Sequence, residues 1–168
     1  TFSGGTDFTT AYFFRGILQE RDGFITQPYG EVGVKLYEEE EGPVRGFTLF
    51  AGLWNSIHGK ATGATGGPTN WYEADAYAGG KLNLFGNTEA KFSYIAYTYP
   101  NGAFPTVQEL DFSLGLNDSE WLGAFGLNRS VLIASELENT ALGPNRGWYM
   151  QFGLRPGGTL IDHETYPV

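Results

Sequence analysis

The sequence predicts an all-β fold: an antiparallel up-and-down sheet of about eight strands. Two observations support it: apolar and polar residues alternate with a period of two along most of the chain, and no segment keeps a helical period. A third is that short connections join consecutive segments, which favours antiparallel neighbours. The clearest segment runs from Trp71 to Phe85. Its apolar or small set is Tyr72, Ala74, Ala76, Ala78, Gly80, Leu82 and Leu84.

Turn-forming residues separate the segments and set the expected strand limits. We expect strands over residues 7–17, 28–37, 45–56, 71–85, 89–98, 109–116, 127–137 and 148–155. Gly86-Asn87 predicts a tight hairpin turn, whereas residues 59–70 fit no periodic pattern and predict a long loop. The acidic run 38–41 predicts a solvated turn, with a cation site as the alternative. After Pro156 the tail resembles the approach to another strand.

The composition points away from an ordinary soluble surface. Charged residues make up 17% of the 168 residues, below the roughly 25% usual in soluble domains, and aromatic residues make up 16%. No run of about 18 apolar residues is present, so a membrane-spanning helix is not expected. The net charge of −9 argues against nucleic acid as a partner, and the absence of cysteine excludes disulfides and thiolate chemistry. We expect one domain over residues 1–168.

The alternation leaves open which face of the sheet meets water. In a soluble lipocalin-like barrel the apolar face would point inward around an apolar ligand, whereas in a transmembrane barrel it would face lipid. We favour the transmembrane barrel, because the polar face is too poor in charge for a soluble exterior. The charges expected to line its lumen are Arg15, Glu31, Lys35, Glu73, Asp75, Lys81, Glu89, Lys91, Glu109, Asp111 and Arg155. The aromatic residues expected at the membrane interfaces are Tyr12, Trp71, Tyr72, Phe85 and Trp148.

Two carboxylate pairs are the strongest candidates for chemistry. Glu73 and Asp75, like Glu109 and Asp111, fall on one face of their strands. Such pairs can belong to a satisfied interior network, to a cation-selective lumen, or to an acid/base couple. The two histidines, His58 and His163, lack metal-ligand spacing, and we expect both to be solvated. We therefore expect no catalysis, no cofactor and no metal.

Several motifs together resemble a family of Gram-negative outer-membrane barrels described as porins, the TorF-like group among them. In order, they are residues 14–17, 26–31, 54–56, 71–79, 97–100 and 108–114. Members of that family are longer than this chain and end in an aromatic residue that it lacks. The resemblance therefore implies that the barrel is incomplete at its C-terminal end and part of a larger one. It also implies a location in the bacterial outer membrane.

The pattern and the resemblance together lead to one expectation of function. We expect a porin-like barrel for passive diffusion of small solutes or cations, or a structural outer-membrane protein. Its partners would be outer-membrane lipid and the diffusing solutes. A homo-oligomer or larger membrane assembly is left open. The soluble lipocalin-like barrel and a rim enzyme using a carboxylate pair are the alternatives.

Overall fold

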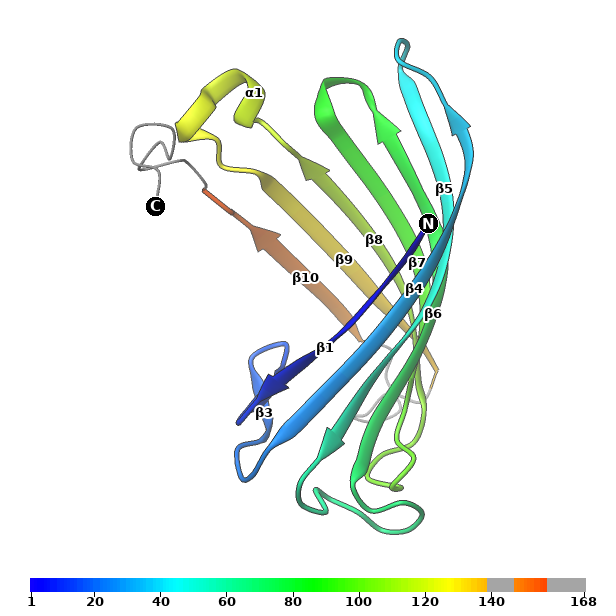
Figure 1. The fold of residues 1–168 in the computed structure, drawn as a ribbon, viewed down its shortest axis with the longest axis vertical. Coiled ribbons are helices and arrows are strands. Elements are labelled where there is room, and N and C mark those ends of the chain that lie inside the picture. The colour runs from blue at the N-terminus through cyan, green and yellow to red at the C-terminus, as the bar shows by residue number, and fades with distance from the viewer. Residues whose placement is uncertain (139–146, 157–168) are drawn as a thin grey trace, which may run out of the picture.

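The computed structural model describes residues 1–138 and 147–156, and it is built almost entirely from strands (Figure 1). Eight strands form one antiparallel sheet in the order β1-β4-β5-β6-β7-β8-β9-β10, and β2 pairs with β3 in a separate hairpin. The sheet strands are β1 (Phe2–Thr9), β4 (Ile25–Glu38), β5 (Val44–His58), β6 (Trp71–Leu84), β7 (Thr88–Thr98), β8 (Val107–Leu116), β9 (Arg129–Glu138) and β10 (Trp148–Gly153). The hairpin strands are β2 (Tyr12–Phe14) and β3 (Ile17–Glu20). The predicted all-β antiparallel fold is confirmed.

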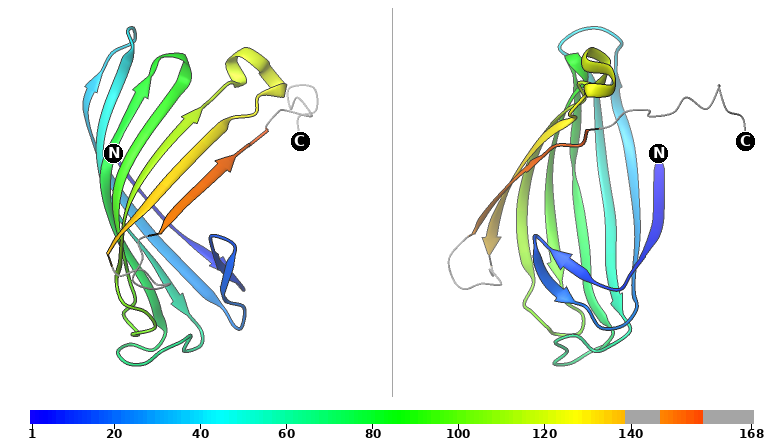
Figure 2. Two further views of the ribbon diagram at one scale, coloured as in Figure 1. Left: turned by 180° about the vertical axis from the view of Figure 1, so that it is seen from behind. Right: turned by 90° about the vertical axis from the view of Figure 1, so that its left-hand side faces the viewer.

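The sheet curves into an open trough (Figures 1 and 2). Within the described residues β1 and β10 pair with one neighbour each and not with one another, so the sheet does not close on itself. The β2–β3 hairpin lies across the open side of the trough, in front of the strands in the right-hand view of Figure 2. The face that carries the hairpin is called the inner face below, and the opposite face the outer face.

The connections differ between the two ends of the trough. At one end lie the turns 39–43 and 85–87, and the connection 117–128, which contains α1 (Ser119–Leu122) and η2 (Gly123–Phe125). At the other end lie the connections 10–24, 59–70 and 99–106. The turn 85–87, assigned as η1 (Phe85–Asn87), is tight because Gly86 and Asn87 both adopt positive φ. In the described part of the chain, no helix is long and apolar enough to cross a bilayer.

Apolar side chains cover the outer face, where they are exposed. Examples are Val34 at 60% exposure on β4, Leu53 at 58% on β5 and Phe112 at 48% on β8. The inner face instead buries polar side chains, including Ser93 and Glu109. This distribution is the reverse of a soluble protein, in which buried residues are mostly apolar.

The first expected strand, over residues 7–17, is wrong. The chain leaves the sheet after Thr9, whose Oγ1 donates to the Ala11 carbonyl over 2.9 Å, and residues 12–20 form the hairpin. The turn of the hairpin is Arg15-Gly16, and both residues have positive φ. Alternation continues through this break, because hairpin strands also have a period of two. Periodicity alone therefore missed that the segment turns.

A β-bulge corrects the expected facing of Tyr72. Ser56 pairs with Glu73 and Ile57 pairs with Trp71, which leaves Tyr72 as an extra residue on β6. Tyr72 is 2% exposed and lies against the inner-face residue His58. The extra residue shifts the alternation by one position. The expected further strand after Pro156 and the residue His163 lie outside the described residues.

Candidate functional site

The candidate site is the inner face of β6, β7 and β8 together with the hairpin that covers it. The hairpin reaches five strands through side chains. Phe14 meets Tyr97 on β7 edge to face, with ring centroids 5.5 Å apart. The other reaching residues are Tyr12, which meets β5 and β6, and Arg15, which meets β8 and β10. A two-stranded segment of nine residues thus contacts more than half of the strands of the trough.

Arg15 makes a bidentate contact between the hairpin and the sheet. Its guanidinium donates to both oxygens of Glu109, over 2.8 and 2.5 Å, and Tyr97 Oη donates to Glu109 Oε1 over 3.2 Å. The guanidinium carbon also lies 4.9 Å from the centroid of Phe14 and 4.2 Å from that of Tyr149. Burial opposes the charged form of Arg15, but the bond to Glu109 prevails and raises its pKa. A bidentate pair fixes both distance and orientation.

Tyr12 fixes the hairpin on β6. Its Oη donates to Glu73 Oε2 over 2.9 Å, and Glu73 is 2% exposed. Burial, and next the Glu73 carboxylate, raise the pKa of Tyr12, so the phenol remains a donor at any ordinary pH. Beside it, Tyr72 Oη donates to Gln19 Oε1 on β3 over 2.6 Å. The hairpin therefore meets β6 through two phenol hydrogen bonds.

A buried polar chain joins the hairpin, a loop and β5. His58 is 1% exposed and stacks on Tyr72 with ring centroids 4.5 Å apart. Its Nε2 lies 2.9 Å from Ser56 Oγ and its Nδ1 lies 2.8 Å from Thr62 Oγ1, which in turn donates to Glu20 Oε2. The expectation of a solvated His58 is wrong. The signal that could have found it is that Ser56 and His58 continue the inner-face set of β5.

The hydrogen-bonded series Ser56–His58–Thr62–Glu20 resembles that of a serine hydrolase, but its burial indicates a structural role. Ser56 is fully buried, so no substrate carbonyl can approach its Oγ. The Thr62 hydroxyl also stands between His58 and Glu20, where a hydrolase places the carboxylate directly on the imidazole. The arrangement satisfies buried polar atoms and ties the hairpin to loop 59–70.

The two carboxylate pairs are only partly satisfied. Glu73 and Glu109 are held by Tyr12 and Arg15, whereas Asp75 Oδ1 and Asp111 Oδ1 are buried without a hydrogen-bond partner. Among the described residues, none of the expected lumen lysines, Lys35, Lys81 and Lys91, forms an ion pair with these four carboxylates. The interior network expected from the sequence is therefore formed around the hairpin alone.

The remaining expected lumen charges spread along the trough. Lys35 bonds Glu38 over 2.5 Å, and Lys81 lies 3.6 Å from Glu89. Lys91 Nζ lies 4.5 Å from the centroid of Phe50, so it faces the inner surface as a cation–π contact. Two further expected members are Glu31, which shares the inner-face register with Gly52, and Arg155, which lies beyond the end of β10 and is exposed. Arg155 does not line the trough.

Of the five aromatic residues expected at the membrane interfaces, two lie on the inner face and three are exposed. Tyr12 and Tyr72 belong to the inner face, so the prediction that they lie outside is wrong, for the reasons of the hairpin and the bulge given above. Trp71, Phe85 and Trp148 are exposed by 41%, 66% and 74%. Their role at a membrane interface stays a prediction.

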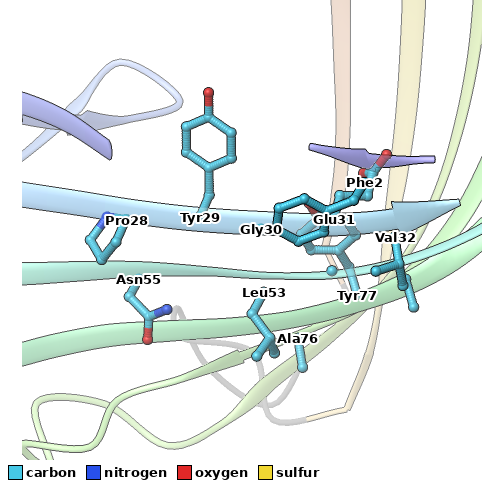
Figure 3. Close-up of a pocket in the computed structure, with 12 residues that line it drawn as sticks. Phe2, Pro28, Tyr29, Gly30, Glu31, Val32, Leu53, Asn55, Ala76 and Tyr77 are labelled. Carbon is cyan, nitrogen blue, oxygen red and sulfur yellow. The ribbon is translucent and has the colours of Figure 1, made fainter. Parts of the chain in front are cut away.

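The outer face holds one shallow depression of about 670 Å³, along β4, β5 and β6 (Figure 3). Leu53, Ala76 and Val32 project to one side of the strands, and Tyr29 projects to the other. Small residues at its floor, such as Ala51 and Ala76, leave the space between larger neighbours. Its lining is mostly apolar, and its few polar side chains, such as Glu31 and Asn55, come from different strands.

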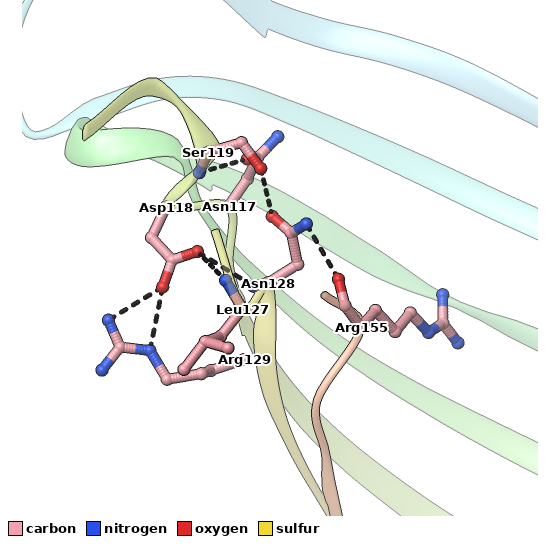
Figure 4. Close-up of polar contacts among 7 residues, drawn as sticks. All are labelled: Asn117, Asp118, Ser119, Leu127, Asn128, Arg129 and Arg155. Atoms are coloured by element: carbon pink, nitrogen blue, oxygen red, sulfur yellow. Dashed lines mark hydrogen bonds and ion pairs between the residues drawn. The ribbon is translucent and has the colours of Figure 1, made fainter. Parts of the chain in front are cut away.

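A separate polar cluster lies in the connection 117–128, at the end of the trough away from the hairpin (Figure 4). Asp118 is fully buried and accepts from the backbone N–H groups of Leu127 and Asn128 over 2.7 and 2.9 Å. Arg129 Nε donates to its other oxygen over 3.1 Å. The Asn128 amide in turn donates to the Arg155 carbonyl over 3.1 Å, which joins the turn to the end of β10. The cluster shapes the connection between strands.

The inner face offers hydrogen-bonding groups and charged side chains, among them the buried Glu73 and Glu109. Within residues 1–138 and 147–156, no group of three His, Asp or Glu side chains could hold a metal ion. Comparison of the chain with protein-family models, curated proteins and solved structures found no match.

Proposed function

We propose that the chain forms the wall of an outer-membrane β-barrel with an acidic lumen, through which small solutes or cations diffuse passively. The observation that carries this proposal is the reversal of the two faces: apolar side chains are exposed outside and charged side chains are buried inside. A lipid-facing barrel wall requires this arrangement. A structural outer-membrane protein without conduction remains the weaker form of the same proposal.

The dimensions of the sheet suit a membrane wall. β4 to β9 contain 10 to 15 residues each, and a tilted strand needs about 9–11 residues to cross the hydrocarbon layer. On the outer face of β8, the run Leu110, Phe112 and Leu114 carries no charge. On this proposal, the apolar outer depression would be filled by acyl chains.

The charges of the inner face support a preference for cations. Acidic side chains in inner-face register outnumber basic ones, because Lys35, Lys81 and Lys91 are the only sheet lysines there among the described residues. The acidic members are Asp7, Glu31, Glu38, Glu73, Asp75, Glu89, Glu109, Asp111 and Glu136. A ring of carboxylates favours cations in a pore.

The two alternatives receive less support. A soluble lipocalin-like barrel needs its apolar face around the ligand, yet the hairpin occupies the polar face. A rim enzyme needs an accessible carboxylate pair, yet Glu73 and Glu109 are 2% and 1% exposed. Both features favour a passive wall.

Single-channel recording of the full-length protein in a planar bilayer tests the proposal. Under a salt gradient we expect stable conductance steps that prefer cations. Glu73→Gln/Asp75→Asn should lower that preference, because it removes two inner-face carboxylates. Glu39→Gln/Glu40→Gln, in an exposed turn, is the matched control and should not alter selectivity.

Two results would count against the proposal. A protein that stays soluble and monomeric without detergent would support the lipocalin-like alternative. Insertion into the bilayer without any conductance, in both the parent protein and its variants, would leave only the structural barrel.

A further inference from the structure

We propose that the β2–β3 hairpin is a displaceable plug of the lumen and that the Arg15–Glu109 ion pair is its latch. This inference rests on the proposed channel, whose regulation it describes. It starts from the way in which the hairpin is attached. Among the described residues, the backbone of 12–20 pairs only within the hairpin, and every contact of β2 and β3 with the eight-stranded sheet runs through side chains. The hairpin can therefore leave without breaking a strand ladder.

The segments that join the hairpin to the sheet suit movement as a unit. On one side, residues 10 and 11 lie between β1 and β2 and are not in a strand. On the other side, Gly23 has a φ of 102°, a conformation that glycine adopts without strain. The hairpin itself stays intact on displacement, since its pairing of Phe14 with Ile17 is internal.

Arg15 occupies a costly backbone position at the tip of the hairpin. Its φ is 48° in a two-residue turn, and both central positions of such a turn favour Asn or Gly. The same residue makes the bidentate bond to Glu109. The chain therefore accepts local backbone strain where it places the guanidinium.

The latch can open because the pair is balanced rather than strongly stabilising. The Glu109 side chain is 1% exposed and that of Arg15 is 18% exposed, so both lose hydration when they pair. The cost of this desolvation offsets most of the attraction between buried charges. When the hairpin leaves, water in the lumen hydrates both groups again. Removal of one partner alone has no such compensation.

The far side of the hairpin explains why its presence would obstruct the lumen. Phe13 and Leu18 pair directly with one another, on the face of the hairpin opposite Phe14, and they are exposed by 59% and 41%. An apolar surface inside a narrow polar pore favours loss of water, and this blocks ions. In the latched position the hairpin thus presents an apolar obstruction to the open side.

The variant Arg15→Asn tests the latch without disturbing the turn. Asn tolerates positive φ well, so the hairpin should still form, but the bonds to Glu109 are lost. Because a hydrogen-bonded charge pair is removed, we expect about a tenfold rise in the ratio of displaced to latched hairpin. In bilayers this appears as a higher open probability or conductance. Arg21→Asn removes the same charge from an exposed position beside the hairpin and should behave like the parent protein.

A second measurement reads the hairpin directly, without conduction. Because the chain contains no cysteine, Phe14→Cys introduces a single thiol beneath the hairpin. Its labelling by a membrane-impermeant maleimide, in the refolded full-length protein, should be about tenfold faster when combined with Arg15→Asn than with Arg21→Asn. Phe13→Cys, on the exposed side, should label equally in both backgrounds.

The two measurements separate this inference from the channel itself. Equal labelling of Phe14→Cys in the Arg15→Asn and Arg21→Asn backgrounds would overturn the plug, even if the protein conducts. Faster labelling with Arg15→Asn in a protein that never conducts would uphold the displaceable hairpin and refute the channel. If the parent protein conducts, equal conductance of the Arg15→Asn variant and the parent would overturn the role of Arg15 as latch.

Discussion

The ring of Tyr77 on β6 lies over Gly52, its direct partner on β5, and fills the space that a side chain at residue 52 would need. Two residues along, Phe50 covers Gly79 in the same way, with its Cζ 2.7 Å from where a Cβ at residue 79 would stand. In the first pair the glycine is on β5 and the ring on β6, and in the second pair the ring is on β5 and the glycine on β6. Aromatic rings laid over glycines fill the inner face near the middle of β5 and β6, because glycine leaves room for a ring to lie flat on the sheet.

Gly52→Ala should destabilise the protein, because the new methyl group overlaps the Tyr77 ring and the Gly30 carbonyl. Overpacking of this kind costs about 1–3 kcal/mol. Gly115→Ala is the matched control: a Cβ there meets open space, and replacing a strand glycine should stabilise by about 0.5–1 kcal/mol. Urea unfolding in detergent micelles measures both. Equal effects at the two sites would contradict the ring-over-glycine packing.

A charge placed on the outer face should destabilise the folded protein more, the deeper its position lies in the bilayer. Phe112 lies near the middle of β8, and Phe112→Arg should cost about 2–4 kcal/mol in lipid vesicles. Phe85 lies in the turn after β6, where Phe85→Arg should cost only about 0–1 kcal/mol. Equilibrium refolding into vesicles gives both values. If the cost at residue 112 matched that at residue 85, the outer face would not be the lipid-facing one.

Asp118 should make the stability of the protein depend on pH in the acidic range. Hydrogen bonds from the backbone of Asn128, then from Leu127, and the side chain of Arg129 hold the pKa of Asp118 below its usual range. A lowered folded-state pKa gives stability that is present above the unfolded value of about 3.9 and is lost as pH falls through the folded value. The unfolding midpoint of the parent protein should therefore fall in that acidic window. Asp118→Asn should lower the midpoint at neutral pH and flatten its dependence on acid, whereas Asp22→Asn, in an exposed loop, should leave the profile intact.

Asn101 should hold two loops of the same end together. It is fully buried, and its amide donates to the carbonyls of Thr62 and Thr69 over 2.9 and 3.4 Å, while its oxygen accepts from the Ala103 N–H over 3.0 Å. Asn101→Ala leaves these groups unsatisfied, at a cost of about 1–3 kcal/mol. Hydrogen exchange should rise in residues 59–70 and 99–106. Asn70→Ala, on an exposed neighbour, should leave exchange unchanged.

The wall of the trough could be predicted from the sequence because its cause is local. Apart from Tyr72 at the bulge, the alternating polarity of β6 and β8 indicates which face each residue occupies, and Gly86-Asn87 indicates a turn because both residues tolerate positive φ. Seven of the eight expected strands accordingly match sheet strands. The division of the remaining segment at Thr9 rests on one hydroxyl contact and on Arg15 in a position usually held by Asn or Gly, which no alternation records.

The site was harder to predict because it joins residues far apart in the sequence. Arg15 and Glu109 were both expected to line the lumen, but their pairing depends on the hairpin crossing from β1 to β8. His58 was expected in solvent because the expected strand ended at Ser56, whereas β5 continues to His58. Its burial follows from Tyr72, which the bulge turns inward. Such contacts depend on tertiary geometry, which strand periodicity does not specify.

The hairpin is inserted between two strands that pair directly, β1 and β4. Loop-closure entropy grows only with the logarithm of length, so replacing a tight turn by this fifteen-residue connection costs of order 1 kcal/mol. The sheet therefore tolerates changes in the length and sequence of this segment far better than changes in its strands. The hairpin and the sheet can therefore change independently, and one sheet scaffold can carry hairpins of different sequence.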